Sequence, residues 1–173
     1  SVNVLGNQLT MTPALNFNGT ADISVTVSDG ELTDSEIFEF IVTPMNDAPV
    51  LAAIADTSTV EDTPLTITLS AGDVDGDDLS FTAVSGDGNV TVSVVDDQLT
   101  LTPAENWNGT VNISVTVSDG DLEDLEVFAL TVTPTNDPPT ISLPDDFTFD
   151  EDNSLIVDFS GYVGDIDEDE LAL

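Results

Sequence analysis

The segment Thr110–Ser118, TVNISVTVS, decides the fold class of this chain. Apolar and polar residues alternate along it without a break, and a period of two is the pattern of a β-strand that buries one face. Similar short runs of Val, Ile, Thr and Phe recur along the 173 residues between Asp, Asn, Gly and Pro. The pattern predicts an all-β protein.

The residues that lead into this segment belong to an internal repeat. NWNGT at 106–110 returns as NFNGT at 16–20, a shift of 90 residues. At that shift, 30 of the 50 positions in residues 1–50 are identical to those in residues 91–140, which indicates duplication. A period near 90 suits an immunoglobulin-sized β-sandwich, which takes about 100 residues.

The repeat divides the chain into three predicted parts. Residues 1–47 are the C-terminal half of one repeat, residues 48–138 are a complete repeat, and residues 139–173 begin a third. Alternation in the complete repeat predicts seven strands that close as two sheets over their apolar faces. The strands are expected at 50–60, 65–70, 79–84, 90–95, 98–102, 110–118 and 126–133. We therefore expect tandem Greek-key, immunoglobulin-like β-sandwiches of about 90 residues each.

The composition excludes several kinds of chemistry. The chain has 35 Asp and Glu but no Lys, Arg, His or Cys, and its formal net charge is −35. Without His or Cys there is no ordinary zinc site and no His-activated nucleophile. Without Lys or Arg there is no phosphate clamp and no basic patch for nucleic acid. No apolar run approaches the 18 residues that a membrane span needs. The chain reads as an internal, extracellular fragment.

The same composition points to a bound cation. Two like charges about 4 Å apart repel by roughly 4 kcal/mol at an effective dielectric constant near 20. Neighbouring carboxylates in this chain have no basic side chain to neutralise them, so they must repel, protonate or share a metal ion. Six to eight hard oxygen ligands around one ion are what Ca²⁺ requires. We therefore expect calcium.

One acidic loop recurs with its spacing preserved. Asp73, Asp75 and Asp77 alternate with other residues, and Asp165, Asp167 and Asp169 repeat the spacing in the third part. Asp and Gly also dominate ordinary turns, but recurrence favours metal binding. The loop is not an EF-hand, because the twelfth residue from Asp73 is Val84 where that motif needs Glu.

Two further motifs resemble a known family. VTVSDG at 25–30 and 115–120, with NDAP at 46–49 and NDPP at 136–139, resembles the cadherin-like repeats of large bacterial surface proteins and adhesins. The resemblance covers the whole chain. It implies cadherin-like β-sandwiches with calcium at each junction, held by an early-strand acid, acids near the domain base, an Asn-Asp linker and an Asp-x-Asp loop of the next domain.

By that resemblance, each junction has its own set of candidate ligands. At the first junction they are Asp29, Asn46, Asp47, Asp73 and Asp75, with Asp77 in the same loop. The early-strand acid of that junction would lie before Ser1. At the second junction they are Glu61, Asp62, Asp119, Asn136, Asp137, Asp165 and Asp167, with Asp169 in the same loop.

The sequence therefore predicts a calcium-rigidified spacer, and not an enzyme, in a long secreted or cell-surface bacterial adhesin or extracellular fibre. Its partners would be calcium ions and neighbouring repeats, with no nucleic acid and no direct membrane insertion. Two alternatives stay open. The repeat could bind carbohydrate through calcium. Separate copies could also join into a filament by strand complementation, because the two partial repeats cover complementary parts of one sandwich.

Overall fold

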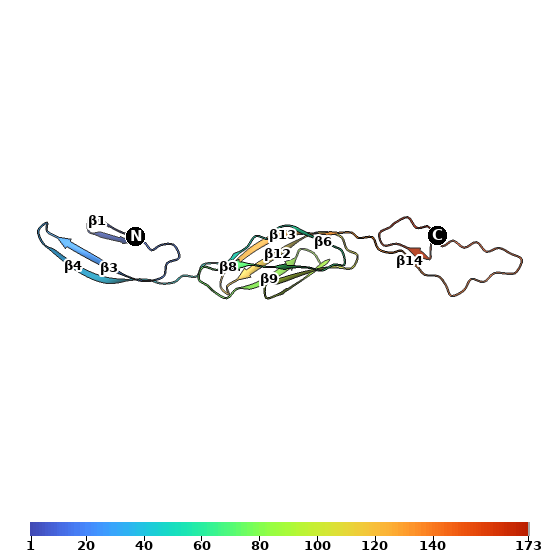
Figure 1. Ribbon diagram of the computed structural model, residues 1–173, viewed down its shortest axis with the longest axis horizontal. Coiled ribbons are helices and arrows are strands. Elements are labelled where there is room, and N and C mark those ends of the chain that lie inside the picture. The colour runs from blue at the N-terminus through green and yellow to red at the C-terminus, as the bar shows by residue number, and fades with distance from the viewer. Residues whose placement is uncertain (173) are drawn as a thin grey trace.

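The structure is a computed structural model that describes residues 1–172. Every regular element in these residues is a β-strand, which confirms the all-β class. Three parts of the chain follow one another along the longest axis (Figure 1). We call them the first part (1–47), the middle repeat (48–138) and the third part (from 139), after the predicted boundaries. The predicted end of the third part, Leu173, lies outside the described residues.

One sheet of the middle repeat has four strands in the order β6-β13-β12-β9. β12 and β13 pair antiparallel from Gly109↔Val132 to Ser118↔Glu123. β9 lies antiparallel on the other side of β12, and β6 lies parallel to β13. The strands are β6 (Thr57–Val60), β9 (Ser80–Ser85), β12 (Gly109–Ser118) and β13 (Glu123–Thr133).

The second sheet has three strands in the order β10-β11-β7. They are β7 (Leu65–Thr68), β10 (Val90–Val95) and β11 (Gln98–Pro103). The chain crosses between the two sheets four times, from β6 to β7, β7 to β9, β9 to β10 and β11 to β12, as expected for a Greek-key sandwich. The inward residues of both sheets form the core: Leu99, Leu101, Val111, Ile113, Val115, Val117, Phe128, Leu130 and Val132 are each at most 5% exposed.

The predicted strand 50–60 is wrong as a single element. It is two strands, β5 (Val50–Leu51) and β6, and β5 pairs with the short β8 (Ala71–Gly72), which was not predicted. Between them the backbone changes partners: Ala52 N donates to Ser70 O at 2.8 Å, whereas Asp56 Oδ1 accepts Ala129 N at 2.8 Å. The apolar pattern of the sequence continues through this change of pairing partner and therefore does not reveal it.

The first part reproduces the pairing of the middle repeat. β3 (Gly19–Ser28) and β4 (Thr33–Val42) pair from Gly19↔Val42 to Ser28↔Thr33, which is the β12–β13 register shifted by 90 residues. β1 (Val2–Leu5) and β2 (Gln8–Met11) form a second hairpin. The apolar faces differ, however, because Phe38 is 39% exposed and its counterpart Phe128 only 2%.

The third part is mostly irregular in the described residues. β14 (Thr140–Ile141) and β15 (Val163–Gly164) pair antiparallel. Phe147, Phe159 and Tyr162 lie together, with ring centroids 6.0–6.3 Å apart. No helix among residues 1–172 is long and apolar enough to cross a membrane.

The contrast between Phe128 and Phe38 yields a stability prediction. Phe128→Ala should cost about 3–5 kcal/mol, the range for truncating a buried aromatic residue. Phe38→Ala, the same change at the equivalent position, should cost much less because that ring is partly in water already. Urea unfolding followed by the fluorescence of Trp107 measures both. Equal losses would contradict the assignment of the core to the middle repeat.

Candidate metal centres at the two junctions

At the first junction, one loop of the middle repeat folds around the carboxylate of Asp73. Asp73 Oδ1 accepts backbone N–H groups from Asp75, Gly76 and Asp77 at 2.8, 2.9 and 3.4 Å. Gly76 has φ +82°, a conformation that glycine adopts without strain. Asp73 Oδ2 is buried and, within the described residues, has no hydrogen-bond partner. A buried carboxylate oxygen without a partner is costly unless a cation binds it.

The linker is held against this loop. Asp47 N donates to Asp75 Oδ2 at 2.8 Å, and Asn46 Nδ2 donates to Asp119 Oδ2 at 2.9 Å. Oxygens of Asp73, Asp75 and Asp77 lie within 4.8 Å of one another. The loop and the linker therefore bring six predicted residues together at this junction: Asn46, Asp47, Asp73, Asp75, Asp77 and Asp119.

The predicted places of Asp119 and Asp29 are wrong. Asp119 lies at the first junction, because it sits in the β12–β13 turn, at the opposite end of the repeat from the exit of β13. Asp29 sits in the equivalent β3–β4 turn, a full strand length away from the first junction. Each acid therefore belongs to the N-terminal end of its own repeat. A motif match shows which turn holds an acid but not at which end of the sandwich that turn lies.

These turns are set by their own acids. Asp119 Oδ1 accepts the N–H groups of Asp121 and Leu122, both at 2.7 Å. Those bonds, Leu122 first, hold the pKa of Asp119 below its ordinary value, with a smaller effect from Asn46. Bonds from Leu32 and Glu31 likewise lower the pKa of Asp29. Both carboxylates stay ionised in mild acid.

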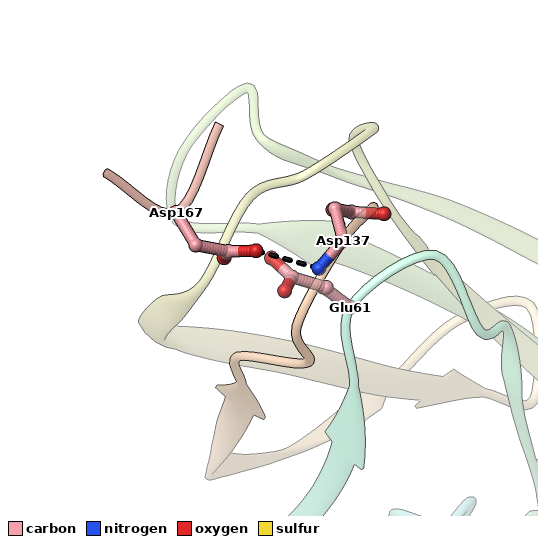
Figure 2. Close-up of side chains that lie close together, drawn as sticks. All are labelled: Glu61, Asp137 and Asp167. Carbon is pink, nitrogen blue, oxygen red and sulfur yellow. Dashed lines mark hydrogen bonds between the residues drawn. The ribbon is translucent and has the colours of Figure 1, made fainter. Parts of the chain in front are cut away.

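At the second junction, three acidic residues from three segments lie close together (Figure 2). Glu61 follows β6, Asp137 lies in the linker, and Asp167 lies in the third part; their oxygens are within 4.8 Å of one another. Glu61 is only 4% exposed, and its Oε1 accepts Thr135 N at 2.6 Å. Asp137 N donates to Asp167 Oδ2 at 2.6 Å, which repeats the bond from Asp47 to Asp75.

The other predicted residues of this junction surround that cluster. Asp165 Oδ1 accepts the backbone N–H groups of Asp167 and Asp169 at 3.0 and 3.3 Å. Asn136 Nδ2 donates to the carbonyl of Asp137 at 3.0 Å. Asp62 has φ +58°, and its Oδ1 accepts Asn106 N at 2.9 Å.

Sequence reasoning missed the amides of the NWNGT loop. Asn106 lines a cleft of about 510 Å³ together with Asp137 and Asp165, and Asn108 Nδ2 lies 3.5 Å from Glu61 Oε2. At the first junction, Asn16 and Asn18 line a cleft with Asp47 and Asp75. The sequence did hold a signal, because both Asn residues recur in the repeated pentapeptide. Amide oxygens, like carboxylate oxygens, can be calcium ligands.

Desolvation and like-charge repulsion raise the pKa of one carboxyl group in each cluster. The pKa of Asp137 is raised, first by loss of water around it and then by Asp167, Asp62, Glu61 and Asp165. The pKa of Asp77 is raised in the same way, with Asp73 and Asp75 as its main charged neighbours. The donor set consists of oxygen alone, it is strongly anionic, and one of its oxygens is orphaned at Asp73. These residues fit a hard divalent cation.

The fold and the two oxygen-lined junctions define a β-sandwich protein with acidic joints. A model of the family described as cadherin-like domain matches residues 45–133. The chain belongs to this cadherin-like domain family.

Solved structures with a similar outline include Drosophila N-cadherin repeats EC1–3, with a TM-score of 0.44, 11% identity, and coverage of 75% of this chain and 47% of that chain. Domains 4–9 of the surface layer protein SbsC give a TM-score of 0.38 at 18% identity, with coverage of 75% of this chain and 20% of that chain. An endo-fucoidan hydrolase from glycoside hydrolase family 107 gives a TM-score of 0.39 at 18% identity, with coverage of 78% of this chain and 22% of that chain. The chain thus spans less than half the length of these proteins. No curated protein sequence matches it.

The raised pKa of Asp137 predicts that one substitution has opposite effects on stability in chelator and in calcium. A carboxyl whose folded-state pKa lies above its ordinary 3.8 destabilises the folded protein at neutral pH. Asp137→Asn should therefore raise the melting temperature in excess chelator. Asp137→Asn should also weaken any calcium binding at this cluster about tenfold or more, because it removes one of the candidate carboxylate ligands.

Differential scanning calorimetry at pH 7, with chelator and with calcium, measures both effects. The advantage of Asp137→Asn in chelator should also shrink as the pH falls through the raised pKa of Asp137, because the wild-type carboxyl then protonates. A variant that is less stable than wild type in chelator would show that repulsion is not the dominant interaction at this residue.

Proposed function

We propose that this chain is a structural spacer of an extracellular or cell-surface protein, and that calcium at its junctions makes it stiff. The observation that supports the proposal most directly is the cluster of Glu61, Asp137 and Asp167. It joins the body of one repeat, the linker and the next repeat within 4.8 Å. An ion that binds all three carboxylates would restrain all three segments at once.

The donor sets favour calcium over other metals. At the first junction, Asn46, Asp47, Asp73, Asp75, Asp77 and Asp119 would hold it. At the second, Glu61, Asp62, Asn136, Asp137, Asp165, Asp167 and Asp169 would do so. Six or more oxygen ligands from several segments suit the irregular coordination of Ca²⁺, whereas Mg²⁺ demands a strict octahedron and keeps several waters. When bound, the ion supplies positive charge that the side chains of this chain lack.

The linkers are short and already restrained at one side. Pro49 is fully buried in the middle repeat, so the freedom of the first linker is confined to the few residues before it. Like-charge repulsion opens such a joint, and a shared cation closes it. A chain of rigid joints grows in length linearly, whereas a chain of flexible joints grows roughly as the square root of residue number. Calcium would thus increase the reach of the protein.

The proposed setting is outside the cell, where calcium is abundant. Extracellular modules bind calcium with dissociation constants of roughly 10⁻⁴–10⁻³ M. Sites of that strength would fill in such a setting, and membership of the cadherin-like family supports it. Membership of the cadherin-like family supports a non-catalytic role. An adhesin stalk or an extracellular fibre would use such a spacer.

Small-angle X-ray scattering on the 173-residue chain tests the stiffness directly. In millimolar calcium we expect a larger maximum dimension and a narrower distribution of conformations than in excess chelator, at equal ionic strength. Magnesium at the same concentration is the control for simple charge screening and should have a much smaller effect. Identical scattering with calcium and with chelator would rule out a calcium-stiffened spacer.

We propose end-to-end assembly as a second candidate function, because the apolar faces of the outer parts are open. Val27 and Phe38 in the first part are 67% and 39% exposed, and Phe149 and Leu155 in the third part are 62% and 43% exposed. In the middle repeat, strands equivalent to these two parts pair with each other, as β6 does with β13 and β7 with β11. The third part of one copy could cover the first part of another.

Sedimentation velocity over a range of concentrations tests this assembly. Phe38→Asp should weaken self-association, since it places a charge on the open apolar face. Ser24→Asp adds the same charge to the opposite face of β3 and should leave association unchanged. A chain that stays monomeric at high concentration would exclude this second function.

A further inference from the structure

Asn106 occupies a fixed position between the middle repeat and the linker. It lies in the loop between β11 and β12 with φ +53°, a conformation in which Asn and Asp are enriched. Its backbone N–H donates to Asp62 Oδ1 at 2.9 Å. The next residue, Trp107, packs against the core and lies so close to Gly109 that an added Cβ there would be 2.9 Å from the ring. The loop therefore has little freedom to move.

The side-chain amide of Asn106 faces two carboxylates from different segments. The structure places the amide oxygen, Oδ1, toward them, so that three oxygens converge. Turned over, the amide brings Nδ2 to 3.2 Å from Asp62 Oδ2 and 3.0 Å from Asp137 Oδ2, where it donates to both. Three converging oxygens repel one another unless a cation lies among them. The same side chain can thus serve the junction both without and with a cation.

We propose that Asn106 is a positioning residue that latches the linker to the middle repeat when calcium is absent. Its amide protons bridge Asp62 and Asp137, which holds Asp137 beside Glu61 and Asp167 despite their mutual repulsion. With a cation at this junction, the opposite orientation of the amide would turn Oδ1 toward it. The calcium-bound half of this inference rests on the proposed function, but the calcium-free half does not.

The first junction carries the same element. Asn16 has φ +57° and lines the cleft that also contains Asp47 and Asp75, the counterparts of Asp137 and Asp167. Because the Asn has the same left-handed backbone conformation at both junctions, we infer that the conformation of the loop fixes its position. A neutral amide also suits the position, because a carboxylate there would add to the repulsion and a basic side chain would compete with the metal ion.

The latch predicts how the ion binds. A site whose ligands are held together before binding spends less free energy on ordering them when the ion arrives. Asn106 should therefore contribute to calcium affinity through the calcium-free state. Removing its amide protons should loosen the junction in chelator even where calcium can still close it.

Distance measurements between two spin labels across the second junction test the proposal. The chain has no Cys, so Thr102→Cys and Ser142→Cys, two exposed positions on either side of the linker, can be labelled specifically. Asn106→Asp keeps the shape and tolerates the positive φ but has no amide protons. Asn106→Gly tolerates the positive φ and removes the side chain. Asn112→Asp is the matched control: it adds the same charge to an exposed strand position where the first part already has Asp22.

In excess chelator, we expect the distance distributions of wild type and Asn112→Asp to be wider than in calcium but clearly narrower than those of both Asn106 variants. Millimolar calcium should narrow the distribution of Asn106→Asp to that of calcium-loaded wild type, because the variant still offers an oxygen. Asn106→Gly should need about tenfold more calcium for the same effect. Unchanged thermal unfolding of the middle repeat, followed by Trp107 fluorescence, shows that the variants fold.

Two results would overturn the latch. One is an Asn106→Asp distribution in chelator that is as narrow as that of wild type. The other is a wild-type distribution in chelator that is as broad as that of both Asn106 variants. Neither result depends on whether calcium stiffens the chain, so failure of the latch and failure of the spacer function are distinguishable.

Discussion

Repulsion between carboxylates, with no basic side chain to offset it, is the constraint on which the arrangement of this chain depends. The core of the middle repeat excludes charge, and among the described residues Glu61 is the buried acid. Even this acid lies at an end of the sandwich, where Thr135 and Asn108 donate to it. Acids from different segments meet at the junctions, where one cation can neutralise several of them.

The sandwich itself sets the distance between these acidic ends. β12 and β13 run antiparallel for about ten residues, which corresponds to roughly 33 Å of strand. Their turn places Asp119 at one junction, and the exit of β13 leads to Asp137 at the other. Interdigitated apolar side chains fill the space between, so the body of the repeat has little freedom to bend. Flexibility is confined to the linkers, which is where the acids lie.

The sequence predicted the parts of this structure that follow from local pattern. Alternation identified β12 and β13, and the repeat of the Asp73 loop identified a candidate metal-binding loop. It could not show that residues 52–56 pass from the β5–β8 pair to the four-stranded sheet, because a change of pairing partner does not alter the hydrophobic period. Nor could it assign Asp119 to its junction, since that depends on strand direction in three dimensions. Asn106 escaped attention because a neutral amide carries no charge signal.

The hydrogen bonds at the junctions leave oxygens free for a metal ion. Asp73 uses Oδ1 for three backbone N–H groups and leaves Oδ2 without a partner in the described structure. The linker N–H groups of Asp47 and Asp137 likewise take one oxygen each from Asp75 and Asp167. A cation can bind the remaining oxygens without breaking these bonds. The framework of the joint is then common to both states, so a cation would change its stiffness and leave the fold as it is.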